Sequence, residues 1–569
     1  MATIDSTLAS LAAGAAALAG RGPAARAALA IETARAVAAA ADAWVEAAVA
    51  VKTRHERSGG THVAAAAARA EELATGPLAT LRLLAITARA LREIDRAGVP
   101  RPCAAPRLLH PQRPATASQS AAFVGVDVLP ERRLFDGAIF RGHSCVVRCA
   151  DPGGLEAFDR SWREEAHRRP REGGVCLVLG AGNVTGLAAA DTISQVFEHG
   201  RGVLLKLHPL HGPLEPVLAR ALAPLVSAGL VAIVTGGAEL ARDAVAAPAV
   251  THVHLTGGQG AFDALVWGGP GPRPPQAVPL LAKPITCELG NVTPWVVVPG
   301  RYTPVQLRFQ ADMIAASIAN NTSFNCIATK CVVTCRSWDQ RDEFLRLVAR
   351  RLESLPARPA WYPGSTAAWE AVSGRPAPAD GSLPAVFRPG VDAAREPRWL
   401  DREWFVPVAV EVPLEAGSSD EFCGRATEFT RGLPGSLAAS VTAPATLSAH
   451  DRRRVDLLAE HLEYGVVAVN TWSALGYALA SVPWGGYPGG TLATPRSGIG
   501  RVHDPLLLPL VHNSILRAPL VVRPLPPWFP WHSRGERLAG GVVEMLGAIA
   551  AGRTGLGPLV RMLPAVLAG

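Results

Sequence analysis

The sequence predicts an α/β protein with two doubly wound domains, and three observations support this prediction. The chain has 569 residues and 49% hydrophobic content, more than one hydrophobic core usually accommodates, so we expect two or three structural units. Short apolar runs alternate with helical stretches over 175–257. A second segment of the same kind runs from about 285 to 482. Such alternation is typical of successive βαβ units around a parallel sheet.

The first 100 residues are rich in alanine and have helical periodicity, which predicts several packed helices that serve as a scaffold. Breaks are expected at 20–23, 58–60 and 76–77, where glycine, serine and proline interrupt the pattern. β-Branched and aromatic residues then become frequent from Phe135 to Cys149, which indicates extended strands.

The alternating segment predicts four strands and three intervening helices. The expected strands cover 175–179, 203–207, 231–234 and 250–255. The expected helices cover about 186–199, 213–228 and 238–246. Ligands bind such sheets at the carboxyl ends of the strands. The loops that follow the strands should therefore line one edge, at 180–183, 206–209, 236–237 and 256–258.

A Pro/Gly/Ala-rich stretch over 356–397 interrupts the second segment and is interpreted as a long surface excursion. The last 50 residues, after Arg517, begin with closely spaced prolines and end in a weakly amphipathic apolar helical pattern. No apolar run reaches the roughly 20 residues that a membrane-spanning helix needs.

The formal net charge is +8, but the arginines are scattered apart from short runs at 167–171 and 452–454. Solvated faces explain them better than a nucleic-acid surface does. The nine cysteines lack the spacing of a structural zinc site, and Asp5 with no early Lys or Arg argues against a secretory signal. We therefore expect a cytoplasmic protein without a metal site.

Cys326, together with Glu288 located 38 residues upstream, predicts covalent chemistry on a carbonyl group. A cysteine attacks as its thiolate and can hold the carbon as a thioester, which a carboxylate can help water to hydrolyse. An inert buried thiol is the competing interpretation of Cys326, and a cap or ion pair is that of Glu288.

The loop Gly180-Ala181-Gly182-Asn183-Val184-Thr185-Gly186 follows a strand and begins a helix, so a dinucleotide fingerprint is one interpretation. The spacing of its glycines differs from that fingerprint. The next strand ends in Lys206-Leu207-His208, with no acidic residue for the ribose hydroxyls. We therefore favour a role for Asn183 as a side-chain hydrogen-bond donor.

Several short motifs follow one another along most of the chain. They are Asn183, Lys206, Thr256-Gly257-Gly258, Glu288-Leu289-Gly290 with Pro294, Asn321 with Cys326, Glu403-Trp404-Phe405-Val406-Pro407, Asn470 and Pro483-Trp484-Gly485-Gly486-Tyr487. Their order and spacing resemble those of the aldehyde dehydrogenase superfamily from roughly 120 to 517. Single motifs of this kind are weak, but so many in register are specific.

The resemblance implies a role for each of these residues. Cys326 would attack an aldehyde, Asn183 and the Cys326 amide would hold the oxyanion, and Glu288 would activate water for thioester hydrolysis. The cofactor would be NAD or NADP, with Lys206 at the adenosine ribose. The remaining cofactor contacts would come from Glu403 and Phe405 at the nicotinamide and from Gly182, Thr256, Gly257, Gly258 and Leu289.

The motifs also depart from the family pattern. Lys206-Leu207-His208-Pro209 replaces the usual Lys-Pro-Ser-Glu, so a glutamate that accepts from the ribose hydroxyls is missing. Its absence removes a repulsion against a 2′-phosphate, which His208 or His211 could favour, so NAD and NADP both stay open. Gly258 replaces the usual serine, and Ser323-Phe324 replaces the Gly-Gln before the cysteine.

Aromatic residues lie next to motif positions that border the substrate tunnel in relatives, at Phe324, Trp472 and Trp484. They predict either a wide apolar pocket or ordinary core packing. The tail segment Trp528-Phe529-Pro530-Trp531 and the helix after it could cover the tunnel mouth, join a neighbouring subunit or touch a membrane. Because this tail carries few charges, we favour a subunit contact or packing within the chain over contact with a membrane.

Together these features predict an aldehyde dehydrogenase-like fold with two α/β domains and a small β arm. The resemblance implies a homodimer or homotetramer that oxidises an apolar, long-chain or aromatic aldehyde to the acid with NAD or NADP. A coenzyme A-acylating enzyme and a catalytically silent scaffold are the alternatives. The expected units are an NAD(P)-binding domain with N-terminal helices (1–136 and 151–285), a catalytic domain (286–482), an oligomerization arm with a return segment (137–150 and 483–517) and a C-terminal extension (518–569).

Overall fold

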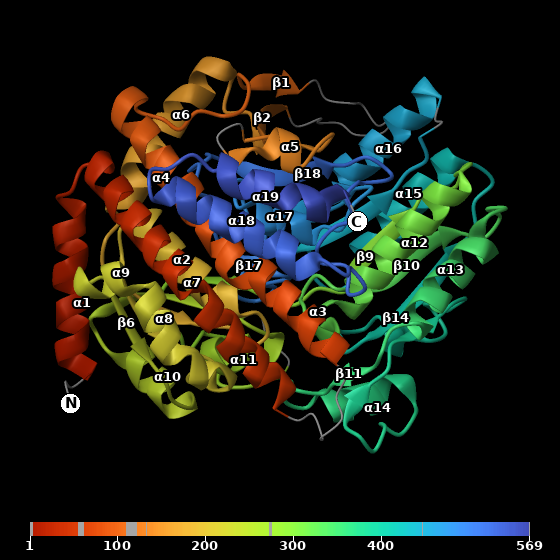
Figure 1. Cartoon of the computed structure of the whole chain (residues 1–569), viewed down its shortest axis with the longest axis horizontal. Helices are drawn as coiled ribbons and strands as arrows, with labels where there is room; N and C mark the ends of the chain where they lie inside the picture. Colours follow the sequence, from red (N-terminus) through yellow and green to blue (C-terminus); the bar gives the residue numbers. More distant parts are fainter. Residues whose placement is uncertain are drawn as a thin grey trace.

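Two β-sheets organise the chain in the computed structural model, which describes residues 4–54, 62–109, 122–131, 134–271, 276–445 and 448–567 (Figure 1). The smaller sheet has six strands in the order β17-β8-β7-β4-β5-β6. In that order the strands span Gly498–Ile499, Ile285–Glu288, Val250–Thr256, Val175–Leu179, Gly202–Lys206 and Val231–Val234. All neighbouring pairs are parallel except β17 with β8, as the βαβ pattern predicted.

Helices cover both faces of the smaller sheet because successive side chains of a strand point to opposite faces. Val175 and Leu177 of β4 pack with Leu8 of α1 (Ile4–Ala19) and with Ala244 of α10 (Ala238–Ala246). The alternate residues of β4 belong to the main hydrophobic core, which also contains residues of α7 (Thr185–Phe197). The carboxyl ends of the strands are left open for a site.

The larger sheet has ten strands in the order β1-β2-β3-β18-β16-β15-β9-β10-β14-β13. They span Arg107–Leu109, Phe123–Leu129, Ser144–Ala150, Val511–Arg517, Val466–Val469, Ala438–Thr442, Thr293–Val297, Thr329–Cys335, Val408–Leu414 and Val386–Arg388. The run from β18 to β13 is parallel, and β1, β2 and β3 extend it as antiparallel strands. A separate two-stranded sheet pairs β11 (Arg358–Pro359) with β12 (Ser382–Leu383).

The predicted β arm is part of this larger sheet. β3 pairs with β18, and β18 pairs in turn with β16 of the same chain. Strand structure was expected from Phe135 onward, but Asp136–Ile139 forms the helix α5 instead. The Asp136 carboxylate, which accepts from the Arg82 guanidinium at 2.7 Å, anchors this turn, and Gly142 then adopts a left-handed φ of 75°. The strand expected from Phe135 was therefore wrong at its start, and β3 begins only at Ser144.

The N-terminal residues form helices, as predicted. α1 is followed by α2 (Pro23–Thr53), α3 (His62–Leu73), a π-helical turn η1 (Ala74–Leu78) and α4 (Ala79–Ala97). The expected break at 20–23 is confirmed, the one at 58–60 lies outside the described residues, and the one at 76–77 is the π turn. Pro77 lacks a backbone donor, and a wider helical turn accommodates it without ending the helix.

The single helix expected over 213–228 was wrong. Residues 209–227 form a 3₁₀ turn η4 (Pro209–Leu214) and two short helices, α8 (Glu215–Ala221) and α9 (Ala223–Ser227). Each of the two helices carries a proline in its first turn, Pro216 and Pro224. Proline is tolerated there but would clash with the preceding turn inside a continuous helix.

The remaining helices lie around the two sheets, and α12 begins with a capping box in which Thr303 and Gln306 bond each other's backbone amides. They are α6 (Leu155–Arg168), α11 (Gln259–Trp267), α12 (Pro304–Ala319), α13 (Arg341–Glu353), α14 (Ser365–Ser373), α15 (Ser419–Arg431), α16 (Ala449–His461), α17 (Ala474–Leu479), α18 (Gly535–Ala550) and α19 (Leu556–Leu567).

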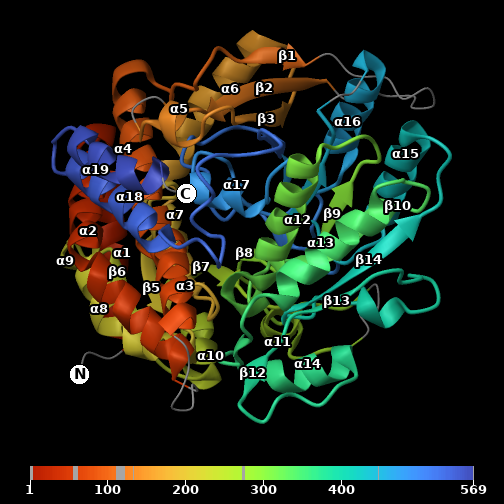
Figure 2. The ribbon, with the colours of Figure 1, turned by 45° about the vertical axis from the view of Figure 1, so that its right-hand side comes forward.

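The C-terminal extension packs within the chain, which is one of the two arrangements that its composition favoured. α18 lies beside α2, α3 and α4, and α19 packs against α18 (Figures 1 and 2). Arg69 pairs with Glu536 at 2.9 Å across this contact. α19 still exposes Leu556, Val560 and Leu563, so a subunit contact stays a prediction. Within the described residues no helix is both long and apolar enough to cross a membrane.

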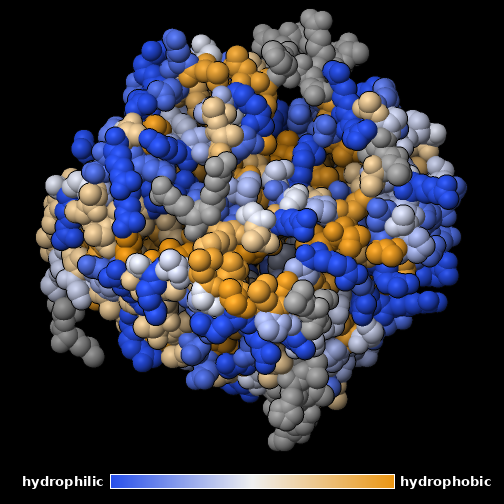
Figure 3. All heavy atoms as spheres, turned by 45° about the horizontal axis from the view of Figure 1, so that its top comes forward, coloured by the Kyte–Doolittle hydropathy of each residue, from blue (hydrophilic) through white to orange (hydrophobic). Residues whose placement is uncertain are grey.

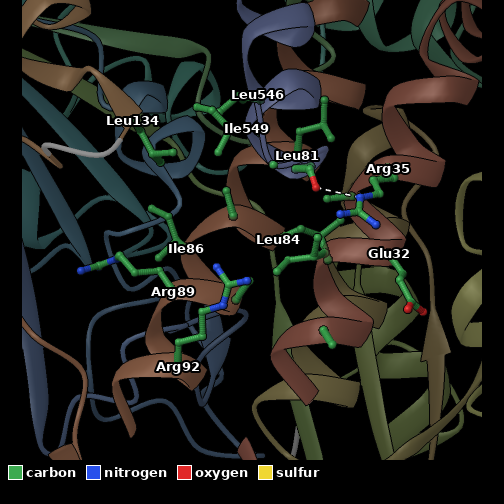
Figure 4. A pocket seen from close by; sticks show the side chains of 17 residues that line it. Glu32, Arg35, Leu81, Leu84, Ile86, Arg89, Arg92, Leu134, Leu546 and Ile549 are labelled. Carbon is green, nitrogen blue, oxygen red and sulfur yellow. Dashed lines mark hydrogen bonds between the residues drawn. The ribbon is translucent and has the colours of Figure 1, made fainter. Parts of the chain in front are cut away.

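The surface mixes hydrophilic and apolar residues, with hydrophobic side chains gathered near the centre of the face in Figure 3. A cavity of about 350 Å³ lies where α2, α4 and α18 meet, with Leu81, Leu84, Leu546 and Ile549 along its walls (Figure 4). The Arg35 Nε atom donates to the Ala550 carbonyl at 2.8 Å beside it. None of the residues predicted for catalysis or cofactor binding lines this cavity.

Candidate active site

The eleven residues predicted for catalysis and for contact with the cofactor line one cavity of about 870 Å³. The cavity extends from the carboxyl ends of β4, β5 and β7 to the loop that carries Cys326. The predicted residues that line it are Gly182, Asn183, Lys206, Thr256, Gly257, Gly258, Glu288, Leu289, Cys326, Glu403 and Phe405. Thus residues that are up to 223 positions apart in the sequence, from Gly182 to Phe405, meet at one place.

The parallel sheet explains why the first of these residues converge. Lys206, Thr256 and Glu288 are the last residues of β5, β7 and β8, and Asn183 lies in the loop between β4 and α7. Because parallel strands place their carboxyl ends at one edge, the four side chains reach a common crevice. The strand pattern predicted this edge for Asn183, Lys206 and Thr256, but it assigned residues from 285 onward to the second segment, whereas β8 with Glu288 belongs to the smaller sheet.

The cysteine loop has an unusual backbone. After α12 ends, Asn321, Thr322 and Ser323 have φ values of 53°, 55° and 64°, in the left-handed region that favours glycine. Such strain costs on the order of 1–3 kcal/mol per residue and persists where surrounding contacts hold it. Ser323, which replaces a usual glycine, accepts a hydrogen bond from the Lys330 ammonium at 2.7 Å. Lys330 thus helps a serine to occupy a position suited to glycine.

Cys326 and Glu288 are in direct contact. The Cys326 thiol donates to Glu288 Oε1 with a separation of 3.2 Å, and the Trp484 indole N–H donates to Glu288 Oε2 at 2.8 Å. Burial raises the pKa of Glu288 to about 7, although the bonds from Cys326 and Trp484 oppose the rise. Burial, with the charges of Glu288 and Glu403, also raises the pKa of Cys326 well above its usual range. The resting thiol is therefore protonated, and the carboxylate beside it can take its proton.

Asn183 lies against the same loop. Its Nδ2 atom donates to the Phe324 carbonyl at 3.3 Å, and its own carbonyl accepts from Asn321 Nδ2 at 2.9 Å. The amide group carries two N–H donors, so one is left for an oxyanion that forms at a carbon bound to Cys326. This placement fits the role that the resemblance implied.

The other half of the cavity fits the nicotinamide cofactor that the resemblance implied. Glu403 Oε1 is buried and has no hydrogen-bond partner among the described residues. The hydroxyl groups of a bound ribose would supply such a partner, because they donate hydrogen bonds. Burial raises the pKa of this carboxyl to about 7, while Lys330 lowers it. A side chain at Gly258 would extend into open space, so its backbone can approach a ligand closely. Lys206, half-buried at the end of β5, supplies a positive charge.

His211 does not belong to this site, although the sequence suggested it for a 2′-phosphate. It is 1% exposed, does not line the cavity, and burial lowers its pKa to about 3. The neutral ring cannot attract a phosphate there. His208 does line the cavity, and its Nδ1 accepts from the Leu210 backbone N–H at 3.2 Å.

Core packing is the better interpretation of the aromatic residues that could have formed a tunnel. Phe324, Trp472 and Trp484 are at most 4% exposed and do not line the cavity. The Trp472 indole donates to the Ile327 carbonyl at 2.7 Å, so it braces the cysteine loop. Trp484 instead orients Glu288, as described above.

Sequence reasoning missed three residues near or in the cavity. Lys330, which supports Ser323, could have been noticed because only four lysines occur in the chain. Tyr362 lines the cavity from the stretch interpreted as a surface excursion, and its ring stacks near His208 with centroids 6.2 Å apart. Arg242 of α10 also lines the cavity. No local signal distinguishes Tyr362 or Arg242, because both depend on how the chain folds back.

The likeness to solved structures is with aldehyde dehydrogenases. An indole-3-acetaldehyde dehydrogenase with NAD+ superposes with a TM-score of 0.57 at 16% identity, over 90% of this chain and 88% of that one. A mutant of aldehyde dehydrogenase C from Pseudomonas syringae, with NAD+ and octanal, gives 0.57 at 16% identity over 92% and 90%. The NADP-dependent glyceraldehyde-3-phosphate dehydrogenase from Bacillus halodurans C-125, with NADP, gives 0.55 at 16% identity over 90% of each chain.

No protein-family model and no curated protein matches the chain in sequence. The likeness is thus one of structure over about nine tenths of the chain. It confirms the predicted fold: the protein has the fold of the aldehyde dehydrogenases.

Proposed function

We propose that this protein oxidises an apolar aldehyde to the carboxylic acid, with NAD or NADP as cofactor. The contact of 3.2 Å between the Cys326 thiol and the Glu288 carboxylate carries this proposal, because it joins a nucleophile to its base in a cavity that fits a dinucleotide. The bound NAD+, NADP and octanal of the structural neighbours support it as well.

The proposed reaction begins with transfer of the thiol proton of Cys326 to Glu288. The thiolate attacks the aldehyde carbon, and the new oxyanion is held by the free N–H of Asn183. A nicotinamide held by Glu403 and Phe405 would accept a hydride from the carbon bound to Cys326, which would leave that carbon as a thioester. Glu288 releases the thiol proton to solvent and then removes a proton from water as the water attacks the thioester carbon. The C–S bond breaks, the carboxylic acid leaves, and Glu288 returns the proton to the Cys326 thiolate.

Water rather than coenzyme A is the proposed acyl acceptor, because Glu288 lies directly beside Cys326. The test is product analysis with a panel of aldehydes and both cofactors, with and without coenzyme A. We expect free acid in the absence of any added thiol. Formation of product only when coenzyme A is present would support the acylating alternative, and no turnover with any aldehyde would support a silent scaffold.

An apolar aldehyde is proposed because apolar side chains line part of the cavity that holds Cys326 and Glu288. Val292, Leu187 and Phe405 line the cavity, and Tyr362 adds a second ring whose centroid is 5.1 Å from that of Phe405. Burial of apolar substrate surface there contributes about 25 cal/mol per Å². Affinity should therefore increase with the length of the aldehyde chain.

The pH dependence should follow Glu288. This group must be ionised to accept the thiol proton, and burial raises its pKa to about 7. We therefore expect kcat/KM to rise ~10-fold per pH unit below that value and to level off above it, since one proton must leave. Steady-state rates between pH 5.5 and 9 measure this. A flat profile through pH 7 would contradict the assignment of Glu288 as base.

The charges near Lys206 should favour NADP over NAD. Lys206 and Arg242 both line the cavity, and the described carboxylates that line it come from Glu288, Asp401 and Glu403 on other segments. Charge-assisted bonds to a phosphate are worth about 1.5–3 kcal/mol, so Arg242→Glu should lower kcat/KM for NADP by about 10- to 100-fold and spare NAD.

The matched control for this prediction is Arg220→Glu. Arg220 is an exposed arginine of α8 in the same domain and does not line the cavity. The ratio of the two kcat/KM values is measured for both variants. The prediction fails if Arg242→Glu and Arg220→Glu leave the ratio equally unchanged.

A further inference from the structure

A buried ion network joins the N-terminal helices to the cysteine loop. Lys52 near the end of α2 pairs with Glu72 at the end of α3, and Arg358 of β11 pairs with Glu71 at 2.7 Å. The side chains of Lys52 and Glu72 are 4% and 0% exposed, and those of Arg358 and Glu71 are 11% and 3% exposed. Two cations thus balance two carboxylates in the interior, as buried charges require.

Lys52 and Glu71 both bond the cysteine loop at Asn321, and Glu72 reaches it through Lys52. The Lys52 ammonium donates to Asn321 Oδ1, and the Asn321 backbone N–H donates to Glu71 Oε1 at 3.1 Å. Asn321 is therefore held through its side chain by α2 and through its backbone by α3. The Trp361 ring lies 5.0 Å from the Lys52 ammonium and covers it from the other side.

The same network reaches the segment that carries Asn183. Thr185, two residues after Asn183, donates from its hydroxyl to Glu72 Oε2 at 2.6 Å. Asn321 Nδ2 donates to the Asn183 carbonyl at 2.9 Å and to the Phe324 carbonyl at 2.8 Å. The segments of the proposed nucleophile and of the proposed oxyanion donor are thus linked through one residue, and the N-terminal helices hold that residue.

The cysteine loop needs such support. Asn321 and Thr322 have φ values of 53° and 55°, and a β-branched residue in the left-handed region is an outlier. Such a backbone persists where its surroundings over-determine it. Lys52, Glu71 and Glu72 do not line the catalytic cavity, so they cannot touch substrate or cofactor. Any effect that they have on the reaction must pass through the loop.

We propose that Lys52, Glu71 and Glu72 are positioning residues, which hold Cys326 and Asn183 in the geometry of attack through Asn321. The proposal deepens the proposed function and rests on it for the catalytic consequence. It assigns a part in the chemistry to N-terminal helices that lie outside both sheets. The position of the thiol itself, however, can be measured without any aldehyde.

The experiment compares two neutralised ion pairs. Lys52→Met/Glu72→Gln removes the pair at the loop and leaves an amide oxygen at position 72 that can still accept from Thr185. Arg82→Met/Asp136→Asn removes a pair of equal burial, 4% and 0% exposed, which bonds the Leu479 carbonyl and the Glu131 amide instead of the loop. Both variants are assayed for kcat, for KM of the cofactor and for alkylation of Cys326 by iodoacetamide, followed by peptide mass spectrometry.

We expect Lys52→Met/Glu72→Gln to lower kcat by about 10²-fold, the loss that a displacement of about 1 Å can cause. KM for the cofactor should not change. Cys326 should be alkylated faster at neutral pH, because a thiol displaced from Glu288 and from its buried position ionises more readily. Cys331 of β10, which is 0% exposed, should stay unreactive and so report that the fold is intact.

The proposal is overturned if the loop pair and the control pair give the same kcat and the same Cys326 alkylation rate. If Cys331 becomes reactive, the double variant has lost its fold, and Asn321→Asp is used in its place. Asn321→Asp retains the oxygen that faces Lys52 but loses the N–H donors to Asn183 and Phe324. A lower kcat in folded Asn321→Asp supports the proposal, and an unchanged kcat overturns it. The parent protein could also oxidise no aldehyde, while only Lys52→Met/Glu72→Gln alters the alkylation of Cys326. That result would support the positioning of the thiol and would contradict the proposed function.

Discussion

Replacing Cys326 with alanine should abolish aldehyde oxidation. The thiol is the group in the cavity that contacts the buried carboxylate of Glu288, and without it no covalent adduct can form. Loss of an enzymatic nucleophile typically lowers kcat by about 10⁴- to 10⁶-fold. We expect no burst of reduced cofactor in a stopped-flow experiment, with cofactor binding retained because Lys206 and Glu403 are untouched.

Neighbouring cysteines should not rescue this variant. Cys287 is 1% exposed, and burial raises its pKa to about 12, so it supplies no thiolate near neutral pH. Cys103→Ala is the matched control, since Cys103 is also partly exposed but lies outside the cavity. It should retain full activity. Steady-state turnover by Cys326→Ala at the parent rate would remove the covalent mechanism altogether.

The parts of the site that were predictable depend on local patterns. Alternating strands and helices place Asn183 and Lys206 at one sheet edge, whereas Glu288 was found from its pairing with Cys326. The sheet also places Thr256 there. Motif spacing then adds Cys326 and Glu403 to the same set. All of these residues line the cavity, although Cys326 and Glu403 lie in the segments that precede β10 and β14 rather than in loops that follow strands.

The parts that could not be predicted depend on long-range packing. Tyr362 and Trp361 come from a Pro/Gly/Ala-rich stretch with no periodic signal, yet their rings lie 5.5 and 5.1 Å from that of Phe324. Lys52 lies in an alanine-rich helix, where a lysine usually faces solvent, but here it is 4% exposed. Its partners are separated from it by up to 269 positions, a pairing that one sequence does not reveal.

Local propensity also failed where a single group controls the backbone. The β-branched content of 135–149 suggested strands, but the ion pair between Asp136 and Arg82 fixes a helical turn at its start. In the cysteine loop, Ser323 adopts a conformation typical of glycine because Lys330 bonds its hydroxyl. Side-chain contacts of a few kcal/mol override such propensities, which amount to roughly 1 kcal/mol per residue.

Replacing Glu288 with glutamine should separate the two halves of the reaction. Glutamine has one oxygen that can still accept from the Trp484 indole, and its NH2 group then faces Cys326, but it cannot remove a proton from water. The negative charge that raises the pKa of Cys326 is also lost, so a thiolate still forms at alkaline pH. We therefore expect one equivalent of reduced cofactor per active site, followed by a stall at the thioester.

Three measurements identify this stall. Rapid mixing should show a burst with an amplitude near the enzyme concentration, intact-mass spectrometry should find the acyl group on Cys326, and added hydroxylamine should restart turnover by cleaving the thioester. Removal of a general base typically lowers the reaction rate by about 10²- to 10⁴-fold, and we expect the steady-state rate to fall by a factor in this range. Glu403→Gln is the control carboxylate: it lies in the same cavity, and its loss should weaken cofactor binding without trapping an acyl enzyme. Parent-like steady-state turnover by Glu288→Gln would show that another group activates water and would reopen transfer to a thiol such as coenzyme A.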